Sequence, residues 1–258
     1  MNNDSNALDF RGKKIFFLLP SAMIQNSIIS ELVQYEYEVY VAKNKDTLRR
    51  VLRKYPGSIV FVDLNEKMSE KEWETWVTAV MSAPDTKSTS VGVITAVDEE
   101  EQKKKYLQKI KVACGYTVVK FETDKAIKQI VEILQAAQAK GRRKYLRATT
   151  DGETSATINI PMEGAYVNGV IKDISVVGVS FTLEGNPEIA KNALVKDVQM
   201  ILQRNRIKVE GILFGSREDS REKVYVLLFA QRTDDEVRSK IRKYVQHNMQ
   251  IKMDVELQ

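Results

Sequence analysis

The hydrophobic pattern of this chain changes once, near Lys140, and the change limits the folds that the chain can adopt. Before Lys140, apolar runs of strand length alternate with longer segments whose apolar residues recur at helical spacing. After Lys140, strand-length runs follow one another until a final helical segment. A chain of 258 residues is long enough for two domains, so we predict a first domain at residues 1–139 and a second at 140–258.

The first domain is predicted to be a doubly wound, flavodoxin-like α/β domain, because five strand–helix units follow one another. Its expected strands include Ile59–Val62 and Val91–Ile94, which are apolar on both faces and suit a parallel sheet covered by helices on either side. Ser69 and Glu72 match a capping box, and Asp46 and Asp124 are expected N-caps. The expected strands are 14–19, 38–42, 58–63, 90–95 and 116–121, and the expected helices are 23–34, 46–55, 69–82, 99–111 and 124–140.

The second domain is predicted to be a small six-stranded antiparallel barrel followed by a helix at 234–249. Turn residues, such as Asp151-Gly152, separate its strand-length runs. The expected strands are 155–161, 165–174, 178–183, 194–202, 206–214 and 223–229.

Composition excludes several classes of protein. No apolar run reaches the ~18 residues of a membrane span, so we expect no membrane insertion. The N-terminus is polar and lacks a secretory signal, which favours a cytoplasmic protein. The only cysteine, Cys114, cannot form an intramolecular disulfide, and the only histidine, His247, lies in the last helical segment. With no P-loop, paired metal carboxylates or nucleophile elbow, the sequence predicts a protein that is not an enzyme.

The five-unit order of the first domain resembles the receiver domain of response regulators. Asp63 ends the third expected strand at the phosphoacceptor position, while Thr95 and Lys120 match the hydroxyl and lysine positions. A receiver places two acidic residues after its first strand to hold Mg²⁺, but this chain has Pro20-Ser21 there. We therefore expect a degenerate receiver-like domain that makes protein contacts, with Asp63 as a vestigial phosphoacceptor; a phosphorylation-responsive regulator is the alternative.

The second domain carries two short motifs at an informative spacing. Arg143 and Arg147 form an RxxxR segment, and Asp173, Ser175 and Gly178 form a DxSxxG segment 26 residues after Arg147. Each motif alone is weak. Their order, their spacing and the expected barrel together resemble the PilZ domain family over about residues 140–230.

The PilZ resemblance implies that the domain binds the second messenger cyclic di-GMP at these residues. Guanidinium groups suit this ligand because they bind phosphate oxygens in pairs and stack on flat bases. The Asp173 carboxylate can accept hydrogen bonds from guanine, and the Ser175 hydroxyl can donate or accept. Gly178 permits a positive φ or a close approach of the ligand.

Arg142, directly before the RxxxR segment, adds a third guanidinium. In PilZ-like proteins such an arginine accompanies two stacked cyclic di-GMP molecules per domain, so the resemblance implies this stoichiometry. Because the arginines lie at the domain junction, ligand binding is expected to order residues 140–148 and to change the interdomain arrangement, which signals to protein partners.

A nucleic-acid partner is the alternative reading of the charge. The chain carries a net charge of +5, and four cations lie in the last helical segment, at Arg238, Lys240, Arg242 and Lys243. A cyclic di-GMP-regulated nucleic-acid-binding protein would use them on phosphates. Acidic residues Asp234–Glu236 begin the same segment, and charges of opposite sign at the two ends of a helix also suit the helix dipole.

Overall fold

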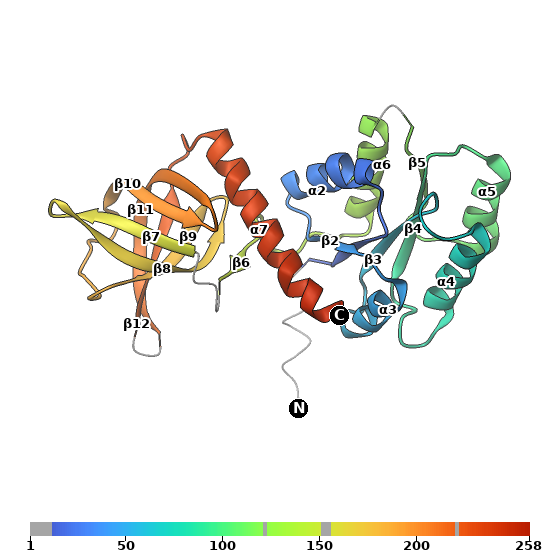
Figure 1. Cartoon of the computed structure of the whole chain (residues 1–258), viewed down its shortest axis with the longest axis horizontal. Helices are drawn as coiled ribbons and strands as arrows, with labels where there is room; N and C mark the ends of the chain where they lie inside the picture. Colours follow the sequence, from blue (N-terminus) through green and yellow to red (C-terminus); the bar gives the residue numbers. More distant parts are fainter. Residues whose placement is uncertain (1–11, 121–122, 151–155, 220–221) are drawn as a thin grey trace. The chain divides into compact units, whose positions relative to one another are not determined.

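The computed structural model describes residues 12–120, 123–150, 156–219 and 222–258 (Figure 1). Contacts divide the chain into two compact units. The first unit contains the residues up to Lys144 together with Gln250–Gln258, and the second contains Tyr145–Met249. Sequence periodicity placed the boundary at 139/140 and gave the whole last helix to the second domain. The contacts differ at that helix because side chains of its last residues bond to the first unit.

A five-stranded parallel sheet forms the centre of the first unit, in the order β2-β1-β3-β4-β5. This order is the flavodoxin-like arrangement that the strand–helix repeats predicted, so the fold class is confirmed. The strands are β1 (Ile15–Leu18), β2 (Val39–Ala42), β3 (Ile59–Asp63), β4 (Ser90–Thr95) and β5 (Tyr116–Val118). The fifth predicted strand continued to Phe121, which lies outside the described residues.

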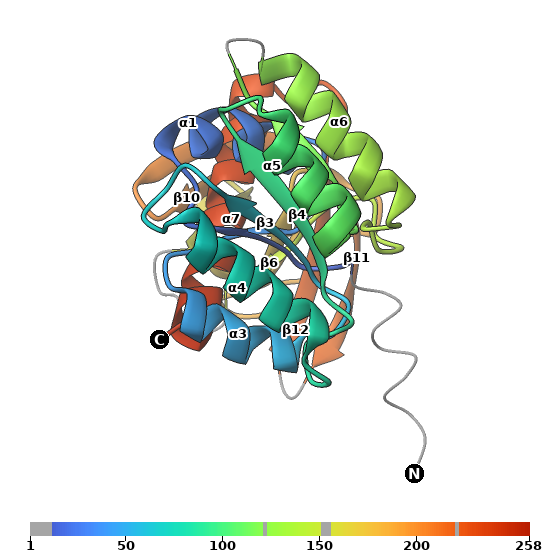
Figure 2. The same cartoon turned by 90° about the vertical axis from the view of Figure 1, so that its right-hand side faces the viewer.

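Helices cover both faces of this sheet (Figure 2). One face packs against a helical segment that runs through α1 (Ala22–Ile24), η2 (Gln25–Ile29) and α2 (Ser30–Gln34), and against α6 (Thr123–Ala136). Burial of their apolar stripes, including Ile28 and Ile130, holds these helices on the sheet. The remaining helices of the unit are α3 (Lys45–Lys54), α4 (Glu70–Ser82), and α5 (Glu100–Lys104) continued by η3 (Lys105–Ile110).

Side-chain hydrogen bonds to backbone N–H groups mark where helices α3 and α4 begin. The capping box of α4 is present, because Ser69 accepts from the Glu72 N–H and the Glu72 carboxylate accepts from the Ser69 N–H at 2.8 Å. The N-cap of α3 is Asn44, whose side chain accepts from the N–H groups of Asp46 and Thr47. The prediction that Asp46 caps this helix was wrong, since the chain offers an amide oxygen two residues earlier. Asp124 likewise lies inside the first turn of α6.

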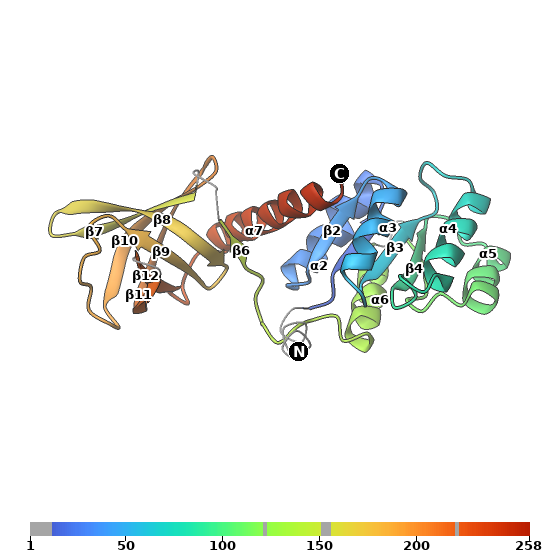
Figure 3. The same ribbon diagram turned by 90° about the horizontal axis from the view of Figure 1, so that it is seen from below.

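The second unit is a closed antiparallel barrel, which confirms the second predicted fold. Its ring runs β8-β7-β10-β11-β12-β9 and closes through a β8–β9 pairing, with the short β6 added alongside β8 (Figure 3). The bounds are β6 (Ala148–Thr149), β7 (Ala156–Met162), β8 (Ala165–Ser175), β9 (Gly178–Leu183), β10 (Leu194–Leu202), β11 (Asn205–Asp219) and β12 (Glu222–Phe229). The predicted turn at Asp151-Gly152 and the first residue of the strand predicted at 155–161 lie outside the described residues.

The barrel interior is filled by alternate residues of its strands. Phe181 and Tyr225 stack there with ring centroids 5.6 Å apart, and Ile158, Ile171 and Met200 are fully buried. Helix α7 (Asp235–Glu256) adds Ile241, Tyr244 and Val245 to the same core. None of the helices in the described ranges combines the length and apolar character needed to cross a bilayer.

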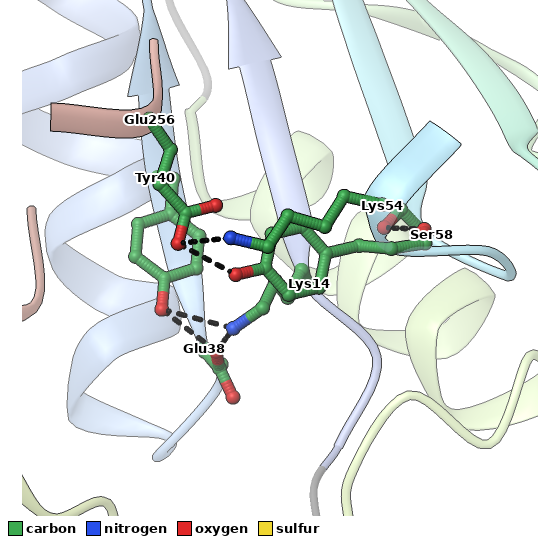
Figure 4. A network of polar contacts seen from close by, with 7 residues as sticks. Lys14, Glu38, Tyr40, Lys54, Ser58 and Glu256 are labelled. Atoms are coloured by element: carbon green, nitrogen blue, oxygen red, sulfur yellow. Dashed lines mark hydrogen bonds and ion pairs between the residues drawn. The ribbon is translucent and has the colours of Figure 1, made fainter. Parts of the chain in front are cut away.

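The last residues of α7 belong to the first unit, where they meet the edge strand β2. The Gln250 side chain accepts from the Val41 N–H at 2.9 Å and donates to the Val41 carbonyl at 3.0 Å, so it takes the place of a further strand. Glu256 accepts from Tyr55 Oη at 2.8 Å and pairs with Lys54 at 3.0 Å (Figure 4). Covering the open edge of a sheet in this way blocks unwanted strand pairing.

Candidate functional site

A β-bulge in β8 turns Asp173 to the outside of the barrel. Ile171 pairs with Phe181 of β9, whereas Asp173 pairs with Ser180, so one extra residue, Lys172, enters β8 between them. Ile171 and Ile174 are both fully buried although their separation is odd, because the bulge absorbs one residue. Without the bulge, Asp173 would share the inward face of Ile171.

Thr150 holds this bulge in place. Its backbone N–H donates to the Lys172 carbonyl at 2.8 Å, and its hydroxyl donates to the Ile171 carbonyl. Thr150 is 3% exposed, so these bonds are shielded from water. It directly follows β6, in which Ala148 pairs with Ile174 and Thr149 with Asp173. The chain that leaves the RxxxR segment is therefore fixed against the first residues of the DxSxxG segment.

The two oxygens of the Asp173 carboxylate have different partners. Oδ2 accepts a hydrogen bond from the Ser180 hydroxyl, and Oδ1 lies 3.5 Å from Nη1 of Arg147. Ser180 is 6% exposed, whereas the Arg147 side chain is 51% exposed. Ser180, which is short and buried, thus holds one oxygen, and Arg147, which is long and half exposed, holds the other. The structure therefore brings together Arg147 and Asp173, two of the predicted site residues.

Ser175 and Gly178 form the tight connection between β8 and β9. Ser175 is 2% exposed, and its hydroxyl donates to the Gly178 carbonyl at 3.3 Å and accepts from the Val177 N–H at 3.5 Å. Gly178 does not have the positive φ that the sequence allowed for. A Cβ on Gly178 would lie 2.6 Å from the Leu227 carbonyl, so a glycine is required by the close approach of β12. Both residues shape the turn that follows Asp173.

Arg142 and Arg143 precede the second unit, in the segment between α6 and β6. Both side chains are exposed to solvent. These two arginines and Arg147 place three guanidinium groups within six consecutive residues, directly before β6 in the sequence.

A hollow lies on the outer face of the barrel, further along β8 and β9 than Asp173 and Ser180. The next pairs along the barrel are Val170 with Thr182 and Thr157 with Val170, and their outward side chains help to line a hollow of about 610 Å³. Asn159, Asn168, Glu184 and Glu222 supply polar groups to the same hollow. Asp173 and Ser180 themselves do not line this hollow.

In the first unit, Asp63 is engaged in holding the loop after β1. Its carboxylate accepts from the Ser21 N–H at 3.1 Å and from the Asn65 N–H at 3.2 Å, and the residue is 4% exposed. Ser21 is part of the Pro20-Ser21 pair that stands in place of the acidic residues of a receiver. A backbone N–H thus faces Asp63 where a receiver would present Mg²⁺ ligands.

The other two receiver positions also have local partners. Thr95 accepts from the Val97 N–H at 3.1 Å, and Lys120 lies 3.5 Å from Asp98. Within the described ranges, no group of three or more histidine, cysteine, aspartate or glutamate side chains is arranged to hold a metal ion.

Arg238 and Lys240, which belong to the cations of the expected last helix, bond within the second unit. Arg238 donates to the carbonyl oxygens of Thr233 and Gln231 at 3.2 and 3.1 Å, and Lys240 pairs with Glu236 at 2.6 Å. These bonds anchor the start of α7, so these two residues have a structural use that needs no nucleic acid.

Fold and site together define a two-domain protein: a receiver-like α/β unit and an antiparallel barrel whose outer face carries arginine and aspartate side chains. Residues 141–247 match the family model described as the PilZ domain. A comparison with curated protein sequences returned no match.

Solved structures resemble each half of the chain. The PilZ domain of YcgR from Escherichia coli, bound to c-di-GMP, is 12% identical, with 45% of this chain and 96% of that chain covered and a TM-score of 0.38. MotI/DgrA from Bacillus subtilis, an inhibitor of motility, is 15% identical, with 44% and 51% covered and a TM-score of 0.35. The chemotaxis response regulator CheY4 of Vibrio cholerae is 19% identical, with 49% and 98% covered and a TM-score of 0.39.

Sequence reasoning missed β6, Thr150 and Ser180. The outward direction of Ser180 could have been predicted from the alternation of side chains along β9. Val179, Phe181 and Leu183 are its apolar positions, so Ser180 lies on the opposite face. Nothing in the sequence marks the bulge at Lys172, which is visible only in the pairing of β8 with β9.

Proposed function

We propose that the PilZ domain binds cyclic di-GMP and that the protein is a receptor for this second messenger, with no catalytic activity of its own. The observation that carries the proposal is the meeting of Arg147 and Asp173 on the outside of the barrel. These residues come from the two motifs whose spacing suggested the ligand, and β6 pairing with β8 brings them to one place.

The chemistry of the two groups suits the two parts of the ligand. The guanidinium of Arg147 can bind phosphate oxygens in bidentate fashion, or stack on a base. The Asp173 carboxylate accepts hydrogen bonds, and guanine presents N–H groups on its base-pairing edge. The two groups lie 3.5 Å apart, which is a loose ion pair that a ligand with both phosphate and guanine can replace.

We further propose that Arg142, Arg143 and Arg147 enclose the phosphates, and that Arg142 recruits a second cyclic di-GMP molecule. All three side chains are exposed, and their positive charges suit the anionic phosphates of such a ligand. Ligand binding would then order residues 140–148, change the interdomain arrangement and present an altered surface to protein partners. The contacts of Asp63 support a receiver-like unit that serves this signalling without phosphorylation.

Calorimetric titration tests the proposal. We expect cyclic di-GMP to bind the wild-type chain with two molecules per chain, Arg143→Ala and Arg147→Ala to abolish binding, and Arg142→Ala to bind one molecule. Arg204→Ala is the matched control, since Arg204 is an exposed arginine of the barrel outside the site. No binding by the wild type would overturn the receptor proposal, and one ligand per wild-type chain would overturn the stoichiometry.

The proposed change in domain arrangement has its own test. We expect cyclic di-GMP to slow amide hydrogen exchange across residues 140–148 and to change the small-angle scattering curve. If ligand binds but neither measurement changes, signalling does not use the junction.

A further inference from the structure

We infer that Ser180 is a positioning residue that makes the PilZ domain selective for guanine, because it fixes the orientation of the Asp173 carboxylate. The inference rests on the proposed binding of cyclic di-GMP. It assigns a role to a residue that lies outside both the RxxxR and the DxSxxG segments.

The hydrogen bond between Ser180 and Asp173 is built into the barrel. Asp173 and Ser180 are direct partners in the β8–β9 ladder, and the bulge at Lys172 turns Asp173 to the face that Ser180 occupies. Ser180 Oγ donates to Oδ2 of Asp173. Since a hydroxyl has one proton, this bond uses the whole donor capacity of Ser180.

Ser180 is better suited to hold the carboxylate than Arg147 is. Its side chain is short, it is 6% exposed, and it lies on a strand that is paired on both sides. Arg147 is long and half exposed, lies 3.5 Å from the other carboxylate oxygen, and is needed for the ligand's phosphates in the proposed complex. When Arg147 turns to the ligand, the bond from Ser180 still fixes the plane of the carboxylate.

A fixed carboxylate plane matters most for a ligand that bonds to both oxygens. Guanine presents N1–H and the 2-amino group side by side, and a carboxylate can accept from both at once. Hypoxanthine keeps N1–H and lacks the 2-amino group. A site built to receive a donor rejects the analogue that lacks it, because a buried acceptor is left without a partner. This rejection is strong only if the carboxylate cannot rotate to suit the analogue.

The structure provides a matched control on the same strand. Thr182 lies two residues after Ser180 on the same outer face, and its ladder partner on β8 is Val170 instead of Asp173. Removal of the Thr182 hydroxyl changes the surface of β9 without touching the Asp173 carboxylate.

The experiment compares cyclic di-GMP with cyclic di-IMP, its hypoxanthine analogue, by calorimetric titration of the full chain. We expect the wild type to bind cyclic di-GMP at least about tenfold more tightly than cyclic di-IMP. In Ser180→Ala the affinity for cyclic di-GMP should fall about tenfold and that for cyclic di-IMP by a smaller factor, so the ratio narrows to about threefold or less. Ser180→Thr keeps a hydroxyl and should restore the ratio, and Thr182→Ala should leave both affinities unchanged.

Each other outcome overturns the inference in a recognisable way. If Ser180→Ala lowers both affinities by one factor, Ser180 supports the barrel and does not set selectivity. If Ser180→Ala binds like the wild type, the hydroxyl has no role in binding. A wild type that binds neither dinucleotide overturns the proposed function together with the inference. Should Ser180→Ala fail to fold, Ser180→Cys, which replaces the hydroxyl with a weaker donor of similar shape, is judged by the same ratio.

Discussion

The backbone N–H of Thr150 donates to the Lys172 carbonyl over 2.8 Å, at the bulge that turns Asp173 outward. The Thr150 hydroxyl donates to the carbonyl of the preceding residue, Ile171. Thr150 thus helps to set the direction of the Asp173 carboxylate, although the two residues are 23 positions apart in the sequence.

Thr150→Val should both destabilise the barrel and weaken binding of cyclic di-GMP. Valine keeps the shape of the side chain but leaves the buried Ile171 carbonyl without this hydroxyl donor, at a cost of about 1–3 kcal/mol. The free energy of unfolding from a urea titration followed by circular dichroism, and the affinity from calorimetry, measure the two effects. Thr157→Val, at a half-buried threonine of β7, is the control and should change stability by less than about 0.5 kcal/mol. Equal effects of the two substitutions would contradict a special role for Thr150.

Asp63 is expected to stabilise the first unit and to remain unphosphorylated. In Asp63→Ala the N–H groups of Ser21 and Asn65 lose their acceptor, which should lower the free energy of unfolding by about 1–3 kcal/mol. Both tryptophans, Trp73 and Trp76, lie in α4, so tryptophan fluorescence during urea unfolding reports on this unit. Asp85→Ala, which removes an exposed ion pair with Arg53, should cost at most about 1 kcal/mol.

Incubation of the wild type with acetyl phosphate and Mg²⁺ tests the second half of this prediction. Mass spectrometry should show no phosphoryl group on Asp63, because a backbone N–H lies where metal ligands would be needed. An adduct on Asp63 that is absent from Asp63→Ala would establish a phosphorylation-responsive regulator instead.

Gln250 is expected to protect the edge of the first sheet. In Gln250→Ala, the Val41 N–H loses the acceptor at 2.9 Å, and amide hydrogen exchange at Val41 should become about tenfold faster, the factor that corresponds to ~1.4 kcal/mol. Val255→Ala changes a residue of the same helix that is 69% exposed, and it should leave the exchange rate of Val41 unaltered. Unchanged exchange at Val41 in Gln250→Ala would show that the end of α7 leaves this edge in solution.

Cys114 should make the stability of the first unit depend on pH in the alkaline range. Burial raises the pKa of the Cys114 thiol to about 11, above its usual ~8.5. The folded state therefore keeps a proton that the unfolded state releases, so this stability is present below about pH 8.5 and is lost as the pH rises towards 11. The free energy of unfolding should fall more steeply between pH 9 and 11 for the wild type than for Cys114→Ala. Parallel curves for the two proteins would contradict this assignment.

Native Cys114 should also resist alkylation at pH 8, whereas urea-unfolded protein reacts.

Both folds, and the residues of the proposed site, could be predicted from the amino-acid sequence. The spacing of apolar residues distinguishes strands from helices, because it must match the faces that each element buries. The change of this spacing after Lys140 marks the transition from a parallel α/β domain to an antiparallel barrel. Arg143, Arg147 and Asp173 could be selected because their spacing, together with short strands, resembles one family. The capping box at Ser69 was equally local and was predicted correctly.

The contacts of these residues, in contrast, depend on how the whole chain packs. The bulge at Lys172 lies in the pairing of β8 with β9, so its effect on Asp173 cannot be read from an alternating sequence pattern. Ser180 and Thr150 reach Asp173 and its bulge through strand pairing across 7 and 21 residues, as the bonds from Ser180 to Asp173 and from Thr150 to Ile171 show. The bond from Gln250 to Val41 spans 209 residues. Local sequence fixes backbone preference and which face is apolar, whereas a hydrogen bond between distant residues depends on the register in which the whole chain packs.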